Sequence, residues 1–171
     1  TCKDTVYLVD DSSDPAFLFK EYNGRHYKIE RGITRDIRKI PELRAGGDIY
    51  EYRKKIIFPY KLVNGINIPY SEQELLLIYP ECYKYLIAAK DELQTRDKGK
   101  KQYPTWFSYA RTQGLNSLGK KLLTPTFSDK PKFILDNSLQ SLFCNGYGVF
   151  MKDNSPLSIN VLQKILNSSV M

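Results

Sequence analysis

Two Asn-Gly pairs constrain the fold of this chain more than any other feature of its sequence. Asn23-Gly24 and Asn64-Gly65 each separate two runs that are rich in β-branched and aromatic residues. Asn and Gly tolerate the positive φ angles of the two-residue turns that join antiparallel strands. The sequence therefore predicts two β-hairpins. Their strands are expected at residues 16–22 and 25–30, and at residues 55–63 and 66–70.

Short apolar runs predict further strands near both ends of the chain. These runs lie at residues 5–9, 122–123, 133–135 and 148–151. Residues 32–48 contain Pro41, Gly46 and Gly47, and Pro and Gly disfavour a regular strand. We therefore expect an irregular excursion over residues 32–48.

Helical signals occupy the middle of the chain and its end. Ser71 and Glu74 have the Ser-x-x-Glu spacing of a capping box, and Pro80 suits the first turn of a following helix. Helical spacing predicts a buried face on that second helix. The residues of this face are Tyr83, Leu86, Ile87, Lys90 and Leu93. Ser155-Pro156 is expected to cap a final helix with an apolar face. Strands, then helices, then strands and a helix predict an α+β fold: a single domain with a twisted, mainly antiparallel sheet packed by two or three helices.

The composition is typical of a folded domain in a reducing compartment. With 171 residues, of which 42% are hydrophobic, the chain can bury one sizeable core. Its apolar runs are too short to cross a bilayer, so no membrane partner is expected. Cys2, Cys82 and Cys144 are odd in number and widely spaced, which predicts reduced thiols in a cytoplasmic protein rather than disulfides or a zinc site. Residues 1–171 are expected to form one domain. Because the chain starts with Thr1, we interpret it as a fragment of a longer chain.

Positive charge is concentrated in two stretches of the chain. The net charge is +7 and the isoelectric point is about 9.2. Residues 96–121 hold seven basic residues against one acidic residue, and residues 31–61 hold nine against four. Such clustering is typical of a surface that binds nucleic acid. We expect the two stretches to form one positive face.

Motifs for catalysis are not found in the sequence. It has no Gly-x-x-x-x-Gly-Lys phosphate loop, no His-Glu-x-x-His helix and no Gly-x-Ser-x-Gly turn. Adenine methylation needs a Pro-Pro-aromatic clamp, and the nearest strings, Phe58-Pro59-Tyr60 and Ile68-Pro69-Tyr70, lack the second Pro. We therefore expect no catalytic residue, no metal site and no cofactor in this chain.

A series of short strings runs from Ile56 to Ser168. The strings are Ile56-Ile57-Phe58-Pro59-Tyr60-Lys61, Tyr79-Pro80, Tyr83-x-Tyr85-Leu86, Lys90-x-x-Leu93-x-x-Arg96-Asp97, Trp106-Phe107, Arg111-x-Gln113, Lys121-Leu122-Leu123-x-Pro125 and Ile165-Leu166-Asn167-Ser168. In their order and spacing they resemble the C-terminal specificity domains, or target-recognition domains, of TaqI-like adenine methyltransferases. The resemblance rests on the ordered set of strings. The first 50 residues match more loosely.

The resemblance implies sequence-specific recognition of double-stranded DNA. It implies a parent chain that is a type IIG restriction–modification enzyme or a related phage-defence methyltransferase. In that family a preceding N-terminal methyltransferase domain binds S-adenosylmethionine and carries the catalytic Asn-Pro-Pro-Tyr-type motif. The expected partners of this chain are therefore double-stranded DNA and that methyltransferase domain, and the cofactor belongs to the parent.

Residue chemistry assigns two kinds of DNA contact. Flexible lysines in glycine-containing loops suit phosphates. These lysines are Lys98, Lys100, Lys101, Lys120 and Lys121. Arg111 and Gln113 suit base edges, because Arg pairs with guanine and Gln with adenine through two hydrogen bonds. Lys61, Arg96 and Trp106 complete the predicted contact set.

Other interpretations of the same residues remain open. The charge run at 98–101 suits a solvated face, Trp106 suits a core next to Phe107, and Arg96 suits the C-terminal end of its helix. Arg111 suits an ion pair with Asp97 or Asp129.

Two alternative functions come from other classes of protein. One is a small metal-dependent nuclease that uses Asp10, Asp11, Lys28 and Glu30. The other is a protein-interaction module with an aromatic docking surface, whose binding would depend little on salt.

Overall fold

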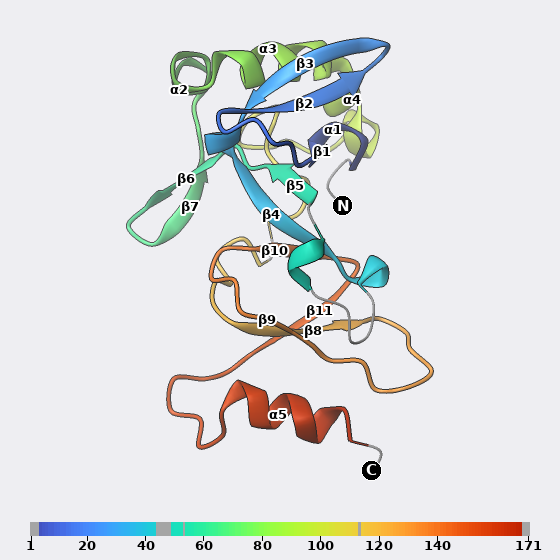
Figure 1. The fold of residues 1–171 in the computed structure, drawn as a ribbon. Coiled ribbons are helices and arrows are strands. Elements are labelled where there is room, and N and C mark those ends of the chain that lie inside the picture. The colour runs from blue at the N-terminus through green and yellow to red at the C-terminus, as the bar shows by residue number, and fades with distance from the viewer. Residues whose placement is uncertain (1–3, 44–48, 53, 113, 169–171) are drawn as a thin grey trace. The chain divides into compact units, whose positions relative to one another are not determined.

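The computed structural model describes residues 4–43, 49–52, 54–112 and 114–168 (Figure 1). Their helices and strands fit the single α+β domain with mainly antiparallel strands that the sequence predicts. The chain packs into two compact units. Unit 1 comprises residues 1–35 and 54–116, and unit 2 comprises residues 36–53 and 117–171. Each unit is built from two separate stretches of the chain.

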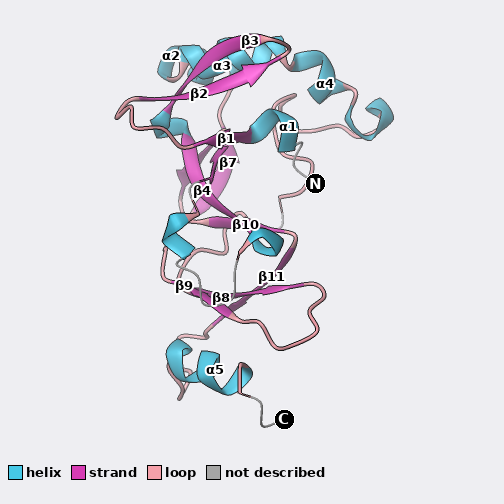
Figure 2. Cartoon of the chain, turned by 45° about the vertical axis from the view of Figure 1, so that its right-hand side comes forward, coloured by secondary structure: helices cyan, strands magenta, loops and turns pink. Residues whose placement is uncertain are grey.

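Unit 1 contains the two predicted hairpins and most of the helical residues. Its elements are α1 (Asp4–Tyr7), β1 (Leu8–Asp10), β2 (Phe17–Tyr22), β3 (Arg25–Glu30), β5 (Lys54–Ile57), β6 (Tyr60–Val63), β7 (Ile66–Pro69), α2 (Glu72–Ile78), α3 (Pro80–Ala88) and α4 (Lys90–Gln94). Strand β4 (Thr34–Lys39) begins in unit 1 and continues into unit 2. Helix α3 packs against the β2–β3 hairpin, and both views show the two side by side (Figures 1 and 2).

Both hairpins form as predicted. Asn23 and Gly24 have φ angles of 50° and 72°, and Asn64 and Gly65 have φ angles of 50° and 80°. The prediction of one strand over residues 55–63 was wrong, because β5 ends at Ile57 and β6 begins at Tyr60. Pro59 lies in the break, where its missing N–H would leave a gap in a continuous ladder.

The capping box at the start of α2 is confirmed, but the buried face of α3 differs from the prediction. Ser71 Oγ accepts from the N–H of Glu74, and Glu74 Oε2 accepts from the N–H of Ser71. Leu86 of α3 and Leu93, which belongs to the separate helix α4, are buried as expected, whereas Ile87 is 42% exposed. The core face instead holds Cys82, Tyr85 and Ala89.

Tertiary contacts explain why Tyr83 is not a core residue and why the strand predicted at residues 5–9 is shorter than expected. The Tyr83 hydroxyl donates to Glu72 at the surface, so Tyr83 is half-buried rather than a core residue. The predicted strand at 5–9 was wrong: α1 ends at Tyr7 and only residues 8–10 extend as β1. The carbonyl of Val6 accepts from the hydroxyl of Tyr85 on α3, and the Tyr7 hydroxyl donates to the carbonyl of Phe107. These contacts hold Val6 against α3 and the Tyr7 side chain against residue 107, and neither residue lies in a strand.

Unit 2 is built around two small groups of strands. Its elements are the second part of β4, β8 (Lys121–Pro125), β9 (Ile134–Asp136), β10 (Leu142–Cys144), β11 (Gly146–Phe150) and α5 (Ile159–Leu166). Strand β8 lies between β11 and β9 and is antiparallel to both. Residues 37–39 of β4 pair in parallel with β10. The buried cluster of this unit consists of Ile40, Leu43, Ile49 and Leu123.

The sequence predictions for unit 2 were correct in part. Strands β8, β9 and β11 were expected, but β4 and β10 were not. The excursion expected over residues 32–48 was wrong for residues 34–39, which form β4, and residues 37–39 of this strand pair with residues 142–144. Gly46 and Gly47 lie outside the described residues. The final helix begins later than expected, since its N-cap is Ser158, whose Oγ accepts from the N–H of Val161 at 3.3 Å. In the described part of the chain, no helix has the length and apolar character needed to cross a membrane.

Candidate nucleic-acid interface

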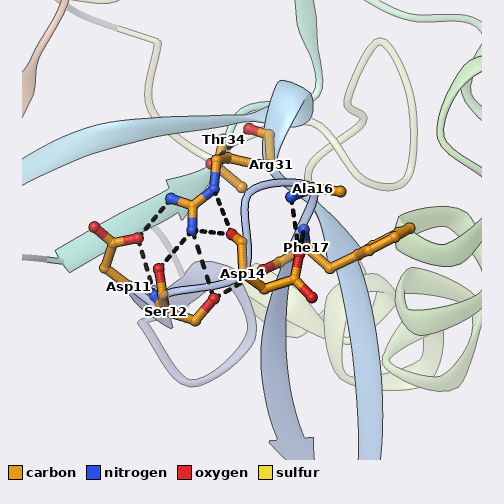
Figure 3. A network of polar contacts seen from close by, with 7 residues as sticks. All are labelled: Asp11, Ser12, Asp14, Ala16, Phe17, Arg31 and Thr34. Atoms are coloured by element: carbon orange, nitrogen blue, oxygen red, sulfur yellow. Dashed lines mark hydrogen bonds and ion pairs between the residues drawn. The ribbon is translucent and has the colours of Figure 1, made fainter.

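The contacts of each basic side chain decide whether it is used by the fold or remains exposed to a ligand. Arg31, which follows β3, is used by the fold (Figure 3). Its Nη1 donates to Asp11 Oδ1 at 2.6 Å, and its Nη2 donates to the carbonyls of Ser12 and Asp14 at 2.7 Å each. Burial acts to raise the pKa of Asp11, but the hydrogen bonds from Arg31 and the N–H of Ser12, together with the charges of Lys55 and Arg31, leave that pKa below its ordinary value. Arg31 therefore fixes the loop between β1 and β2.

Arg96 is also enclosed by the fold. Its side chain is 5% exposed, and its Nε donates to the carbonyl of Leu93 at 2.6 Å. Its Nη1 and Nη2 donate to the carbonyls of Ser108 and Trp106 at 2.7 Å each. Its guanidinium carbon lies 4.5 Å from the centroid of the Tyr103 ring. Arg96 thus ties residues 103–108 to the end of α4, and these contacts agree with the structural alternative given for it above.

Lys121 lies in the interior of unit 2. Its side chain and that of Asp136 are fully buried, with Lys121 Nζ 3.5 Å from Asp136 Oδ2. Arg38 Nε lies 3.8 Å from the same oxygen, and the hydroxyl of Ser141 donates to it. Desolvation lowers the pKa of Lys121. These contacts give Lys121 a structural role.

Lys61 and Trp106 contact carboxylates of helix α2. Lys61 Nζ forms an ion pair with Glu74 and lies 5.9 Å from the centroid of the Tyr70 ring. Trp106 is half-buried, and its Nε1 donates to Glu72 Oε1 at 3.0 Å. The hydrogen bond from Trp106 lowers the pKa of Glu72. The Trp106 and Phe107 rings pack edge to face at 5.1 Å, which agrees with the packing alternative for Trp106.

Four predicted contact residues of unit 1 remain exposed: Lys98, Lys100, Lys101 and Arg111. Lys98 follows a kink after α4 and has a φ angle of 57°. Lys101 Nζ donates to the carbonyl of Ala110 at 3.0 Å, which brings the lysine run beside Arg111. We call these four residues the basic loop cluster. A pocket of about 280 Å³, partly lined by Lys101, Gln102 and Tyr103, adjoins it.

Arg111 has no hydrogen bond or ion pair with any residue that the structure describes. The alternative ion pair with Asp97 is not formed, and the carboxylate of Asp97 instead accepts from the hydroxyl of Tyr103. Lys120 is exposed and belongs to unit 2, whereas the basic loop cluster belongs to unit 1. Gln113 lies outside the described residues.

The two basic stretches are in contact within unit 1. The N–H of Tyr109 donates to the hydroxyl of Tyr60 at 2.6 Å. The amide side chain of Asn67 donates to Asn116 Oδ1 at 2.8 Å. Tyr109 and Asn116 therefore contact strands β6 and β7. Residues 36–53 and 117–121 belong to unit 2, and one continuous positive face stays a prediction.

The residues that motivated the nuclease alternative have structural partners. The carboxylate of Glu30 accepts from the N–H groups of Glu81 and Cys82 at 2.8 Å each and so caps helix α3. Lys28 Nζ lies 5.6 Å from the centroid of the Phe17 ring. Over the described ranges, no three His, Cys, Asp or Glu side chains are grouped so that they could hold a metal ion.

One basic residue of interest was missed by the sequence analysis. Arg35 lies on β4, in a stretch that was not expected to form a strand, so nothing indicated where its side chain would lie. Its guanidinium carbon is 3.8 Å from the centroid of the Phe58 ring. The sequence feature that could have drawn attention to Arg35 is its position within the basic stretch 31–61.

Comparison with known proteins gives one similarity over most of the chain. No protein-family model matches the sequence. Over 173 aligned residues the chain is 31% identical to the type II restriction enzyme and methyltransferase RM.Eco57I of Escherichia coli. The alignment covers 91% of this chain and 17% of that relative. The chain therefore spans about one sixth of the length of the relative it matches.

Proposed function

We propose that this chain is the DNA-recognition part of a restriction–modification enzyme that methylates adenine. The observation that carries this proposal is the similarity to a type II restriction enzyme and methyltransferase over 91% of the chain. In this proposal a separate domain of the parent protein binds S-adenosylmethionine and transfers the methyl group.

The basic loop cluster suits the two tasks of such a domain. Lys98, Lys100 and Lys101 are exposed point charges that would neutralise phosphates and set the position of the duplex. Arg111 has an exposed guanidinium, whose planar donors match O6 and N7 of guanine. Arg96 and Lys121 are explained by the fold, so the proposed contact surface leaves them out.

Adenine methylation itself creates the need for such a domain. The target base lies inside the duplex, and the enzyme must rotate it out of the stack to reach its amino group. A second protein surface has to hold the duplex during this step and select the sequence around the target. An exposed cationic loop with one arginine that is free to reach a base edge is suited to that task.

The proposal is tested by measuring the binding of this chain to duplex DNA by fluorescence anisotropy. The expected affinity falls steeply between about 50 and 200 mM salt, because phosphate contacts release counterions. The double variant Lys98→Ala/Lys100→Ala should lower the slope of log K against log salt by about two units. A matched control is Lys130→Ala/Lys152→Ala, which removes two exposed lysines of unit 2. Salt-insensitive binding, or an equal loss in both double variants, would contradict the proposal.

A further inference from the structure

We propose that a pocket around Arg35 in unit 1 binds a phosphodiester group of the DNA backbone. The pocket has a volume of about 200 Å³ and is lined by residues 32–35, Phe58, residues 60–62 and Tyr70. All of these residues belong to unit 1. The inference deepens the proposed function and rests on it for the source of the phosphate.

Arg35 differs from the other enclosed arginines in having no partner for its charge. Arg31 and Arg38 form ion pairs with aspartates, and Arg96 donates to three carbonyls. Arg35 is half-buried, yet it forms no ion pair with any carboxylate of the described residues. Its Nη1 is buried and has no hydrogen-bond acceptor among them. Burial lowers the pKa of Arg35, which reports the cost of enclosing this charge.

The geometry at Arg35 fits an anion with several oxygen atoms. The guanidinium lies 3.8 Å above the Phe58 ring, which holds one face of the plane by a cation–π contact. Stacking occupies a face of the plane, and the N–H donors lie at its edge, where the buried Nη1 has no acceptor among the described residues. An unpaired buried donor is unfavourable, and phosphate oxygens satisfy a guanidinium edge with two parallel hydrogen bonds.

The rest of the pocket lining supports the same chemistry. Lys61 adds a second positive charge, although Glu74 partly balances it. Tyr70 adds a phenol group beside Tyr79. Burial, with a smaller effect from the hydrogen bond with Tyr70, raises the pKa of Tyr79 to about 12. The Tyr79 phenol therefore remains neutral at physiological pH, and Arg35 carries the charge that would attract an anion.

The variant Arg35→Met tests the assignment. Methionine is unbranched and can still pack on Phe58, but it has no charge and no donors. We expect weaker binding to every duplex and a salt slope that is lower by about one unit. The matched control is Arg25→Met, which removes an exposed arginine of β3 and should leave the slope unchanged. A loss confined to certain sequences would assign Arg35 to a base edge and overturn the phosphate assignment.

Melting temperature provides a second readout that does not depend on DNA. Inorganic phosphate, compared with chloride at equal ionic strength, should raise the melting temperature of the wild type more than that of Arg35→Met. Because phosphate also stabilises proteins in general, the difference between the two proteins is the measured quantity. Without phosphate, Arg35→Met should melt no lower than the wild type, since it removes an unpaired half-buried charge.

The outcomes separate this inference from the proposed function. If Arg35→Met melts lower and phosphate stabilises both proteins equally, Arg35 is structural and the inference is wrong. If duplex DNA binds with an unchanged slope in Arg35→Met, the proposed function stands and the inference fails. If phosphate stabilises only the wild type but no duplex binds, the anion pocket stands and the proposed function fails. If Arg35→Met leaves DNA binding and the phosphate effect unchanged but abolishes the binding of an acidic peptide, the pocket binds a protein carboxylate. The phosphodiester assignment is then wrong.

Discussion

Arg96 and Lys98 lie two positions apart and have opposite environments. Arg96 is 5% exposed and donates to three backbone carbonyls, whereas Lys98 is exposed. We predict that Arg96→Met lowers the free energy of unfolding by about 3 kcal/mol, because buried carbonyls lose charged donors. Lys98→Met should change it by no more than about 0.5 kcal/mol. Urea denaturation measures both values, and equal losses would mean that the Arg96 contacts contribute little.

Arg111 and Lys100 are both exposed in the basic loop cluster but are expected to affect DNA binding differently. In the parent enzyme, Arg111→Ala should cost about 1–3 kcal/mol at the recognised site and relax the preference at one base position. Lys100→Ala should weaken binding to all sequences alike and lower the salt slope by about one unit. Methylation of cognate and single-mismatch duplexes measures the preference.

A melting temperature serves as the control for the Arg111 experiment. If Arg111→Ala lowers the melting temperature and leaves the base preference unchanged, Arg111 supports the fold. The base-reading residues would then be sought among Gln113, Asn116 and the hairpin that carries Lys61.

At the scale of the secondary-structure elements, the contacts of Glu74 at the start of helix α2 are expected to stabilise the fold to a degree that depends on pH. The hydrogen bond from Lys61 and those of the capping box lower the pKa of Glu74 from 4.5 to about 2. Because this pKa is lower in the folded state, the stabilisation is present above pH 4.5 and is lost as the pH falls towards 2. We predict that Glu74→Gln is less stable than the wild type at about pH 6 and that the difference shrinks towards about pH 3. Urea denaturation at several pH values measures this difference.

A matched variant distinguishes this effect from general acid sensitivity. Glu21→Gln replaces an exposed carboxylate of β2 and serves as the control against which the pH dependence of the Glu74→Gln deficit is compared. A Glu74→Gln deficit that stays constant as the pH falls would contradict the role given to the Lys61–Glu74 contact.

Elements with local signals could be predicted from the sequence, and elements with remote partners could not. The Asn-Gly hairpins and the Ser71–Glu74 capping box depend on residues within a few positions of each other. Residues 37–39 of strand β4 instead pair in parallel with β10, more than 100 residues later in the chain. The cap of α3 comes from Glu30 on β3, which no local pattern of the helix could indicate.

The same distinction explains the outcome for the candidate site. Charge clustering in the sequence located the stretch that holds Lys98, Lys100 and Arg111, all exposed in the structure. It could not separate them from Lys121, because the burial of Lys121 depends on Asp136, which is 15 residues away in another strand. A lysine on a solvated surface and a lysine in a buried ion pair have the same sequence signature.

At the scale of the whole molecule, we predict that this chain alone transfers no methyl group from S-adenosylmethionine to DNA. The reason is that the sequence contains neither a cofactor loop nor a Pro-Pro-aromatic clamp. Incorporation of tritiated methyl groups into duplex DNA measures the activity, with the parent enzyme as the positive control. Incorporation by a preparation that is free of other methyltransferases would show that this chain contains a catalytic site of its own.

The discontinuous composition of unit 2 limits how its gene can recombine. Residues 36–53 supply Ile40, Leu43 and Ile49 to the buried cluster, and Leu123 comes from the second stretch, beyond residue 116. A single crossover between the codons for residues 54 and 116 would join the first stretch of one parental gene to the second stretch of another. The hybrid core would then hold side chains that were never selected together, and mismatched volumes in a core lower stability. Hybrids with a single junction between residues 54 and 116 should therefore survive only between close relatives, whereas a crossover before residue 36 transfers both stretches of unit 2 together.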